Sequence, residues 1–214
     1  MIRKKPTALV TAGPTRERID PIRYISNFSS GKQGYAIAKA LHKNGFDVTL
    51  VTGPVAIKPP KGVKIIAVES AEDMLQACLN NLPKNIAICA AAICDFRPII
   101  ISKQKLKKEN LGRDITIKLT KNPDILKTIS NHKLRPKIVV GFAAETENVI
   151  ENAKRKLQTK SCDMIIANDV SDDKVFNKNS TYVHIITPLM VEKSLNGSKD
   201  GVAEYLVSRI CKLL

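Results

Sequence analysis

The chain has 214 residues and a formal net charge of +15, because 35 Lys and Arg outnumber 20 Asp and Glu. Hydrophobic residues make up 43% of the sequence, which is enough for a folded core and excludes a chain that is disordered throughout. The basic charge would attract polyanions. Aromatic residues make up only 4% and Trp is absent, so few side chains could stack on single-stranded nucleic acid.

The sequence shows no sign of export or membrane insertion. It holds no apolar run of about 18 residues, as a membrane helix would need, and the segment from Met1 to Pro6 lacks the apolar stretch of a secretory signal. The five cysteines are spread singly, mostly within apolar segments, which predicts reduced thiols rather than a disulfide framework. We therefore expect a cytoplasmic protein that folds as a single domain over residues 1–214.

Apolar, β-rich segments alternate with amphipathic ones along the chain. The segments expected to form strands are Ala8–Thr11, Asp47–Thr52, Val63–Val68, Ile86–Ala92, Ile138–Phe142 and Met164–Ala167, then Tyr182–Ile186 and Leu189–Glu192, with a turn at Asn196 and Gly197. The first expected helix begins near Gly31 and ends at Gly45, the second begins at the cap pair Ser70 and Asp73, and the third begins at Pro123 with Asn122 as the cap. The last two expected helices span Asn148–Thr159 and Lys199–Leu213.

This alternation predicts an α/β fold: a Rossmann-like, doubly wound, mostly parallel sheet covered on both faces. In such sheets, ligands bind beyond the carboxyl ends of the strands. We therefore expect the chemistry just after Thr11, Ala92, Phe142 and Ala167, where each apolar segment gives way to polar or small residues.

A basic segment interrupts the alternation. Residues 102–137 hold 11 Lys and Arg against three acidic residues, and we expect a flap or insertion at about 99–121. Within it, Ile115–Leu119 alternates between apolar and polar residues and could form half of a hairpin. A charge run of this kind is most often a solvated loop, and the alternative is a patch that binds polyanions.

Two segments have the composition of ligand-binding loops. Asn27-Phe-Ser-Ser-Gly-Lys-Gln-Gly34 opens a helix with Gly and Ser, whose free backbone N–H groups could bind an anion. It is neither a Walker A loop nor G-x-G-x-x-G, and an ordinary helix cap explains it equally well. In Ala90-Ala-Ala-Ile-Cys-Asp95, small residues would let a flat ligand approach the backbone, and Asp95 could accept from a base or ribose or face magnesium. A packed strand end is the alternative.

Three further segments contain lysines or lie at the end of an expected strand. They are Lys105-Leu-Lys-Lys108 in the basic flap, Lys121-Asn-Pro-Asp-Ile-Leu126, and Gly141-Phe-Ala-Ala-Glu-Thr146 with the helix after it. Lys156 and Lys160 share a face of that helix and border its apolar stripe. A solvated loop and an ordinary helix start explain the first two on their own. Cys89 and Cys94 lack the partners that a zinc site needs.

Two other functional classes are alternatives. A nicotinamide-dependent reductase would need G-x-G-x-x-G after the first strand and an acid at the end of the second, but the sequence has Ala12-Gly-Pro and Thr52-Gly-Pro there. A basic nucleic-acid-binding module would show affinity that falls steeply with salt.

Taken together and in order, these segments resemble the bacterial phosphopantothenate–cysteine ligases. The resemblance rests on Thr11–Gly34, Ala90–Pro98, Lys105–Lys108, Lys121–Leu126, Gly141–Thr146 and Ile166–Val170, and it covers nearly the whole chain. It implies that CTP activates the carboxylate of 4′-phosphopantothenate as an acyl-cytidylate with loss of pyrophosphate. The amine of L-cysteine would then displace CMP. Magnesium would assist, and nucleic acid would not be a partner.

The resemblance also implies roles for individual residues. The nucleotide would be bound by Cys89, Ala90, Ala91, Asp95, Lys105, Pro123, Asp124, Ile125, Leu126, Phe142, Lys156 and Lys160. A substrate phosphate would be bound by Ser29, Ser30, Gly31 and Gly34. Lys105 would neutralise the triphosphate, and Asn27 would act in acyl transfer. The magnesium ligands remain unassigned.

The family implies a homodimer with a mobile flap around Lys103–Lys118. Bacterial relatives are often joined to a flavin-dependent decarboxylase half, which this sequence lacks, so we expect no FMN and no decarboxylation, with a separate decarboxylase as a potential partner. Ile93-Cys94 departs mildly from the family's pattern. In a simple doubly wound fold, Lys160 would lie roughly 18 Å from the ligand end of its helix, which conflicts with the role that the resemblance implies.

Overall fold

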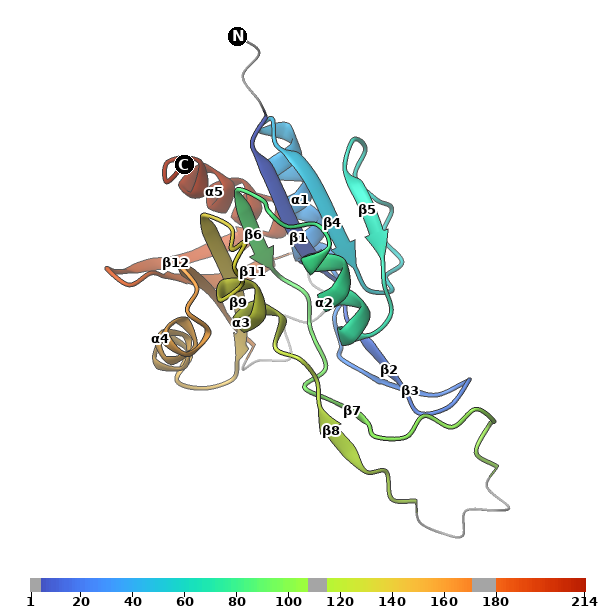
Figure 1. Cartoon of the computed structure of the whole chain (residues 1–214). Coiled ribbons are helices and arrows are strands. Elements are labelled where there is room, and N and C mark those ends of the chain that lie inside the picture. Colours follow the sequence, from blue (N-terminus) through green and yellow to red (C-terminus); the bar gives the residue numbers. More distant parts are fainter. Residues whose placement is uncertain (1–4, 108–114, 171–179) are drawn as a thin grey trace.

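The computed structural model describes residues 5–107, 115–170 and 180–214 (Figure 1). Its centre is an eight-stranded sheet in the order β12-β11-β10-β9-β6-β1-β4-β5. The strands are β1 (Thr7–Ala12), β4 (Asp47–Thr52), β5 (Lys64–Ala67), β6 (Ile86–Cys89), β9 (Ile138–Glu145), β10 (Met164–Asp169), β11 (Ser180–Ile186) and β12 (Val191–Ser198). The first six are parallel and follow the Rossmann order, and β11 and β12 extend the sheet as an antiparallel hairpin. The expected fold class is confirmed.

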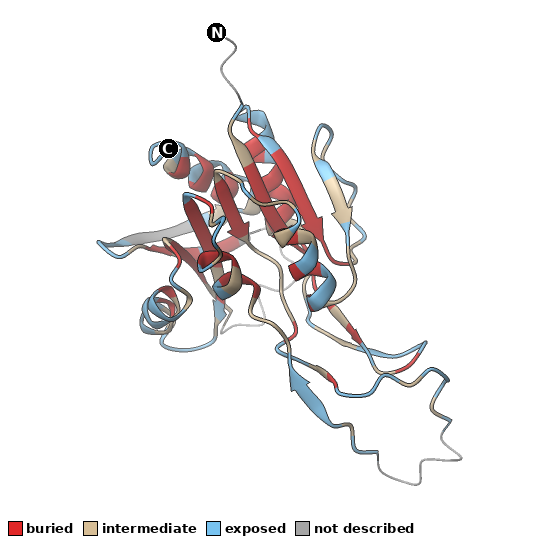
Figure 2. Cartoon of the chain, in the orientation of Figure 1, coloured by how far each residue is buried: buried red, intermediate tan, exposed pale blue. Residues whose placement is uncertain are grey.

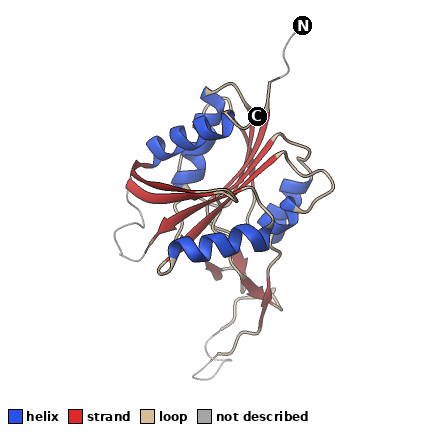
Figure 3. Cartoon of the chain, turned by 90° about the vertical axis from the view of Figure 1, so that its left-hand side faces the viewer, coloured by secondary structure: helices blue, strands red, loops and turns tan. Residues whose placement is uncertain are grey.

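Helices cover both faces of this sheet (Figure 3). Helices α1 (Lys32–Lys43) and α5 (Lys199–Cys211) pack on one face, and α2 (Ala71–Leu79), α3 (Ile125–Ser130) and α4 (Val149–Lys160) pack on the other. Buried residues concentrate in the parallel strands and on the inner sides of the helices (Figure 2). In the described part of the chain, none of the helices has both the length and the apolar character that crossing a membrane requires.

Local sequence explains where the helices begin and end. Gly31 precedes α1 with a φ of 75°, a left-handed conformation that favours glycine, and Gly45 follows the helix with a φ of 85°. Ser70 and Asp73 form the expected capping box of α2. The expected cap of α3 was wrong: Asp124, not Asn122, accepts from the backbone N–H of Lys127. Asn122 is occupied elsewhere, as described below.

Two small antiparallel pairs lie below the main sheet in Figure 1. Strand β2 (Arg16–Arg18) pairs with β3 (Tyr24–Ser26), and β7 (Phe96–Pro98) pairs with β8 (Leu119–Lys121). The sequence did not predict β2, β3 or β7. The half-hairpin expected at Ile115–Leu119 was shifted, because residues 115–118 have no regular structure and the strand spans Leu119–Lys121. Part of the expected flap, including Lys108, lies outside the described residues.

The turn expected at Asn196 and Gly197 was also wrong. Both residues lie within β12, where they pair with Tyr182 and Thr181 of β11. The chain reverses instead between Thr187 and Met190, where the N–H of Thr187 donates to the carbonyl of Met190 at 3.0 Å. Pro188 occupies this turn, and its fixed φ suits the second position of a β-turn. The reversal lets β12 run back along the sheet edge to the start of α5.

Candidate active site

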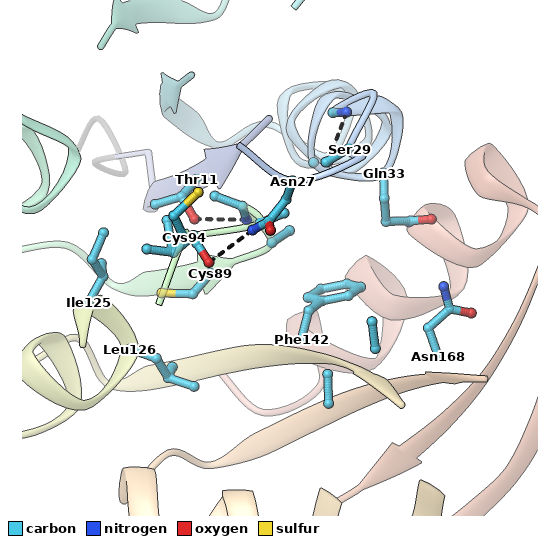
Figure 4. Close-up of a pocket in the computed structure, with 18 of the residues that line it drawn as sticks. Thr11, Asn27, Ser29, Gln33, Cys89, Cys94, Ile125, Leu126, Phe142 and Asn168 are labelled. Carbon is cyan, nitrogen blue, oxygen red and sulfur yellow. Dashed lines mark hydrogen bonds between the residues drawn. The ribbon is translucent and has the colours of Figure 1, made fainter. Parts of the chain in front are cut away.

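A cavity of about 960 Å³ opens at the carboxyl ends of β1, β6, β9 and β10 (Figure 4). This is the edge at which parallel α/β sheets bind their ligands. Five lysines and two aspartates line it: Lys32, Lys121, Lys156, Lys160, Lys199, Asp95 and Asp124. Its charged lining is therefore mainly positive and suits anionic ligands.

The loop before α1 and the first turn of that helix form one wall. Asn27, Ser29, Ser30, Gly31 and Gly34 all line the cavity, as expected. The N-cap residue Gly31 has no side chain that could cap α1, and the Ser29 hydroxyl accepts from the Gly31 N–H at 3.3 Å. The first turn of α1 lines the cavity, where the positive end of the helix dipole favours an anion. The Asn27 side-chain amide donates to the Ile93 carbonyl at 3.0 Å, which holds this loop against the second wall.

Gly34 sets how closely α1 approaches β1. A Cβ at this position would lie 2.5 Å from the Cβ of Ala12 and 3.0 Å from the carbonyl oxygen of Thr11. Only glycine therefore allows the start of α1 to reach the end of the strand. The close approach brings the helix N-terminus and the end of β1 into the same cavity.

The second wall is the segment Cys89–Asp95, which continues from β6. It stays beside the end of β1 because the Ala90 N–H donates to the Thr11 carbonyl and the Ala91 N–H donates to the Thr11 hydroxyl, each at 3.2 Å. Small side chains leave the cavity open along this backbone. Burial raises the pKa of the Cys89 thiol well above its usual value, so the group remains a neutral thiol rather than a nucleophile.

Cys94 is the residue at which the sequence departs from the family's pattern. It is buried, its N–H donates to the Thr15 hydroxyl at 3.0 Å, and its thiol contacts the carbonyls of Thr15 and Ile25 at 3.7 Å. Burial raises the pKa of this thiol. The departure is therefore accommodated in the packing against the β2–β3 pair.

The third wall runs from Lys121 to Leu126 and leads into α3. Asn122 joins it to the second wall, because its side-chain amide donates to the Cys94 carbonyl and its N–H donates to the Asp95 carbonyl, both at 2.8 Å. Its side-chain oxygen accepts from Arg97 at 3.0 Å. These bonds explain why Asn122 is not the cap of α3, and they hold Asp95 in place beside the cavity.

Lys156 and Lys160 of α4 both line the cavity. The Lys156 ammonium donates to the Phe142 carbonyl at 2.9 Å, and burial lowers the pKa of this lysine. Lys160 forms an ion pair with Asp124. The distance expected from a simple doubly wound fold was therefore wrong: α4 is seen end-on in Figure 1, so it crosses the strands rather than running back along them.

Lys105 does not line the cavity, unlike the other residues that the resemblance implied. It is exposed at the root of the flap. Its neighbour Leu106 is held by the β2–β3 connection, since Asp20 accepts from the Leu106 N–H at 3.1 Å and Arg23 donates to the Leu106 carbonyl at 2.6 Å. The Arg23 guanidinium holds the pKa of the buried Asp20 carboxyl far below its usual value.

Sequence reasoning missed several residues of the cavity. Thr11 and Asn168 could have been assigned from the positions of the strand ends. Asn168 accepts from the Thr181 hydroxyl at 2.8 Å. Lys199 carries no comparable signal, because only the hairpin β11–β12 and the packing of α5 against α1 bring it to the cavity.

The residues 5–107, 115–170 and 180–214 contain no group of three His, Cys, Asp or Glu side chains arranged to hold a metal ion. Asp95 and Asp124 are the carboxylates of the cavity lining. Magnesium is usually held by one or two carboxylates together with substrate phosphates and water. The donor set therefore fits an ion that arrives with a nucleotide.

Residues 3–214 match the model of the DNA/pantothenate metabolism flavoprotein C-terminal domain. The chain belongs to this family. Among relatives of the flavoprotein C-terminal domain, the coenzyme A biosynthesis bifunctional protein CoaBC of Haemophilus influenzae is 48% identical over 202 residues, which are 94% of this chain and 50% of that protein. The chain thus spans about half the length of the curated relatives that it matches.

Two solved structures have the same fold as this chain. The C-terminal domain of a CoaBC protein is 37% identical, with a TM-score of 0.76 over 96% of this chain and 93% of that one. A Cab2 variant in complex with phosphopantothenate-cysteine is 15% identical, with a TM-score of 0.77 over 97% of this chain and 87% of that one. At 15% identity, the similarity to the Cab2 variant shows a shared fold alone.

Proposed function

We propose that the chain is a CTP-dependent ligase that joins 4′-phosphopantothenate to L-cysteine, as a step of coenzyme A biosynthesis. The observation that carries the proposal is that the residues of the family motifs line one cavity. They come from the loop before α1, from Cys89–Asp95, from the segment leading into α3 and from α4. Lys105 is the exception. The CoaBC names of the relatives support the same pathway. Phosphopantothenate-cysteine, the ligand of the Cab2 complex, is the compound that this reaction would form.

The reaction would take place in two steps. The carboxylate of 4′-phosphopantothenate would attack the α-phosphorus of CTP, which forms the acyl-cytidylate and releases pyrophosphate. The amine of cysteine would then attack the acyl carbon, form the amide, lose a proton and release CMP. A carboxylate is a poor electrophile, and the mixed anhydride supplies a good leaving group. The lysines of the cavity would reduce the repulsion between two polyanionic substrates.

The nucleotide would occupy the end of the cavity formed by Cys89–Asp95, α3 and α4. The small side chains of Ala90 and Ala91 leave the backbone accessible to a base or ribose, and Asp95 is held where it could accept from them. Lys156 and Lys160 supply positive charge. Magnesium would shield the triphosphate and bind through its oxygens with Asp95 as a candidate ligand.

Asn27 would act in acyl transfer. It lies between the two ends of the cavity in Figure 4, and its side-chain amide donates to the Ile93 carbonyl. A carboxamide has a second donor and an acceptor, which could orient the acyl group or the cysteine amine. Ser29, Ser30, Gly31 and Gly34 would bind the substrate phosphate with the N-terminus of α1.

Lys105 would neutralise the departing pyrophosphate. Because Lys105 is exposed at the flap root and outside the cavity lining, this role requires the flap to close over a cavity, either that of its own chain or that of a second copy.

We also propose a homodimer. Large exposed hydrophobic side chains gather on the β2–β3 connection, β7 and the flap: Ile22, Tyr24, Phe96, Ile99, Ile100, Ile101, Ile115 and Leu119. Ile100 is 82% exposed. Exposed apolar surface of this extent is typical of protein interfaces. A second copy would cover it and bring its flap close to the cavity.

The relatives' other half does not align with this chain, and we assign no flavin to the ligase reaction.

The test is pyrophosphate release from purified protein with 4′-phosphopantothenate and magnesium, compared between CTP and ATP and with or without cysteine. We expect release that needs phosphopantothenate and prefers CTP, with CMP and the amide formed after cysteine is added. Absence of release with either nucleotide from folded protein would refute the ligase. Tight, salt-sensitive binding of RNA or DNA without any response to CTP would favour the basic nucleic-acid module instead.

A further inference from the structure

The tip of the β2–β3 hairpin holds the root of the flap, residues 102–107. In Figure 1 the hairpin extends below the main sheet, beside the chain that follows β7. The buried Asp20 closes the turn between the two strands, because its Oδ1 accepts from the N–H groups of Ile22 at 2.9 Å and Arg23 at 2.8 Å. Aspartate commonly closes turns in this way. Its second carboxylate oxygen is left for contacts outside the turn.

That second oxygen reaches across to the flap. Oδ2 accepts from the Leu106 N–H at 3.1 Å and from the Arg23 Nε at 2.9 Å, and Arg23 in turn donates to the Leu106 carbonyl at 2.6 Å. Both backbone polar groups of Leu106 are thus bound. Earlier in the flap root, the Ser102 N–H donates to the Ile19 carbonyl at 3.0 Å. The hairpin tip therefore holds the flap backbone on both sides of Lys105.

The side chain of Lys105 is left available. It is exposed, and within residues 5–107, 115–170 and 180–214 no ion pair joins it to an acid. A lysine on an unfixed segment would lose both backbone and side-chain freedom each time it bound an anion. The bonds to Leu106 remove part of that cost before any ligand binds.

The base of the hairpin is anchored by different bonds. The Ser26 hydroxyl donates to the Thr15 carbonyl, and the Arg16 N–H donates to the Glu69 carbonyl, both at 2.8 Å. Asn27 follows β3 directly and has its own bond to the second wall of the cavity. A change at the hairpin tip should therefore affect the flap and leave Asn27 in place.

We propose that Asp20 is a positioning residue: by binding Leu106, it places Lys105 for the departure of pyrophosphate in the first step of the reaction. This inference rests on the proposed function. The groups bonded to the carboxylate are the Arg23 guanidinium and backbone N–H groups, which are all donors. Both carboxylate oxygens can accept, whereas an amide at this position would turn an NH2 group toward donors.

The test compares Asp20→Asn with wild type. Asparagine can still accept in the turn, but its NH2 group would face Arg23 and the Leu106 N–H, so the flap root is released while the turn remains. We expect kcat for pyrophosphate release to fall by about 10- to 100-fold, as for other misplaced catalytic groups. The Kd for 4′-phosphopantothenate and the amount of amide formed per pyrophosphate should be unchanged.

Two further measurements distinguish positioning from a general structural role. If Asp20 acts through Lys105, Asp20→Asn should have no further effect on kcat in a Lys105→Met background. Independently of activity, trypsin should cleave after Lys103 and Lys105 about tenfold faster in Asp20→Asn, because the flap root opens more often. Mass spectrometry identifies the cleaved bonds.

The matched control is Glu69→Gln, which removes the 2.7 Å ion pair with Arg18 on the same hairpin and leaves the contacts to the flap intact. Its kcat and its cleavage pattern should match those of wild type. Asp20→Ser is a second variant, in which the short hydroxyl can close the turn but cannot reach Leu106. Thermal melting verifies the fold of each variant.

The outcomes separate the inference from the proposed function. Unchanged tryptic cleavage in both Asp20 variants would overturn the inference alone. So would an active enzyme in which Asp20→Asn lowers kcat by the same factor with and without Lys105. A wild type without ligase activity would refute the proposed function, while faster cleavage of its Asp20→Asn variant would still support the anchoring of the flap root by Asp20.

Discussion

At the residue scale, Lys156 shows how the fold prepares a positive charge for a ligand. Its ammonium has one protein acceptor within the cavity wall, the Phe142 carbonyl at 2.9 Å, and burial lowers its pKa. In the free protein the protonated form is therefore less favourable than it is for an exposed lysine. A bound triphosphate would favour that form again, so nucleotide binding and protonation of Lys156 should be coupled.

This coupling gives a pH prediction. As the pH rises from 7, Lys156 should lose its proton below the ordinary lysine value of 10.5, and the Kd for CTP should rise over that range. Lys156→Met should bind CTP about tenfold more weakly at pH 7.5 and lose this pH dependence. Calorimetric titration at several pH values measures both effects. Lys154→Met, an exposed position on the same helix, is the control. A parallel pH dependence in Lys156→Met would contradict the assignment.

At the element scale, the contact between α1 and β1 depends on Gly34. Gly34→Ala would place a methyl group 2.5 Å from the Ala12 Cβ, so the helix must shift. We expect a loss of about 1–3 kcal/mol in the free energy of unfolding and weaker binding of 4′-phosphopantothenate, because the N-terminus of α1 moves away from the cavity. Urea denaturation and calorimetry provide the two measurements.

Gly45→Ala is the control for that prediction. Gly45 also has a positive φ, but a Cβ there would meet nothing within 4 Å. Backbone strain should cost about 1 kcal/mol, while substrate affinity stays unchanged. Equal losses of affinity in the two variants would show that the position of α1 is not what matters.

The helices and strands also show how much of the fold could be predicted from the sequence. Apolar runs and cap residues gave the parallel strands, the helices and the strand ends that meet at the cavity, because these signals are local. The pairs β2–β3 and β7–β8 were missed or shifted, since strands of three residues are too short to show a period. The direction in which α4 crosses the strands and the position of Lys199 at the cavity depend on tertiary packing, which no local pattern contains.

The residues of the site also fall into those that could be predicted from the sequence and those that could not. Asp95 was a candidate because it follows the end of a strand, and the same rule could have given Thr11, which was missed. The family resemblance added Phe142, Lys156 and Lys160, which line the cavity. The α3 cap was misassigned because Asn122 and Asp124 are both good cap residues. Only the bonds from Asn122 to Cys94 and Asp95 decide between them.

At the scale of the whole molecule, the exposed apolar side chains of the flap region lead to a prediction about assembly. Ile100→Glu should convert the proposed dimer into a monomer, because a buried unpaired carboxylate at the interface is unfavourable, and ligase activity should fall with it. Analytical ultracentrifugation measures the mass. Leu189→Glu alters a residue that is 94% exposed at the β11–β12 turn and should stay dimeric. A wild-type monomer with full activity would rule out the dimer.

The packing of α5 on α1 joins the first helix of the chain to the last. The cavity needs Thr11 from β1 and Lys199 from α5, and between them the chain completes the sheet and its terminal hairpin. During translation, the cavity is not complete until α5 has emerged, because Lys199 closes one side of it. A translation product truncated before α5 would contain the strands of the sheet but would lack this part of the cavity wall.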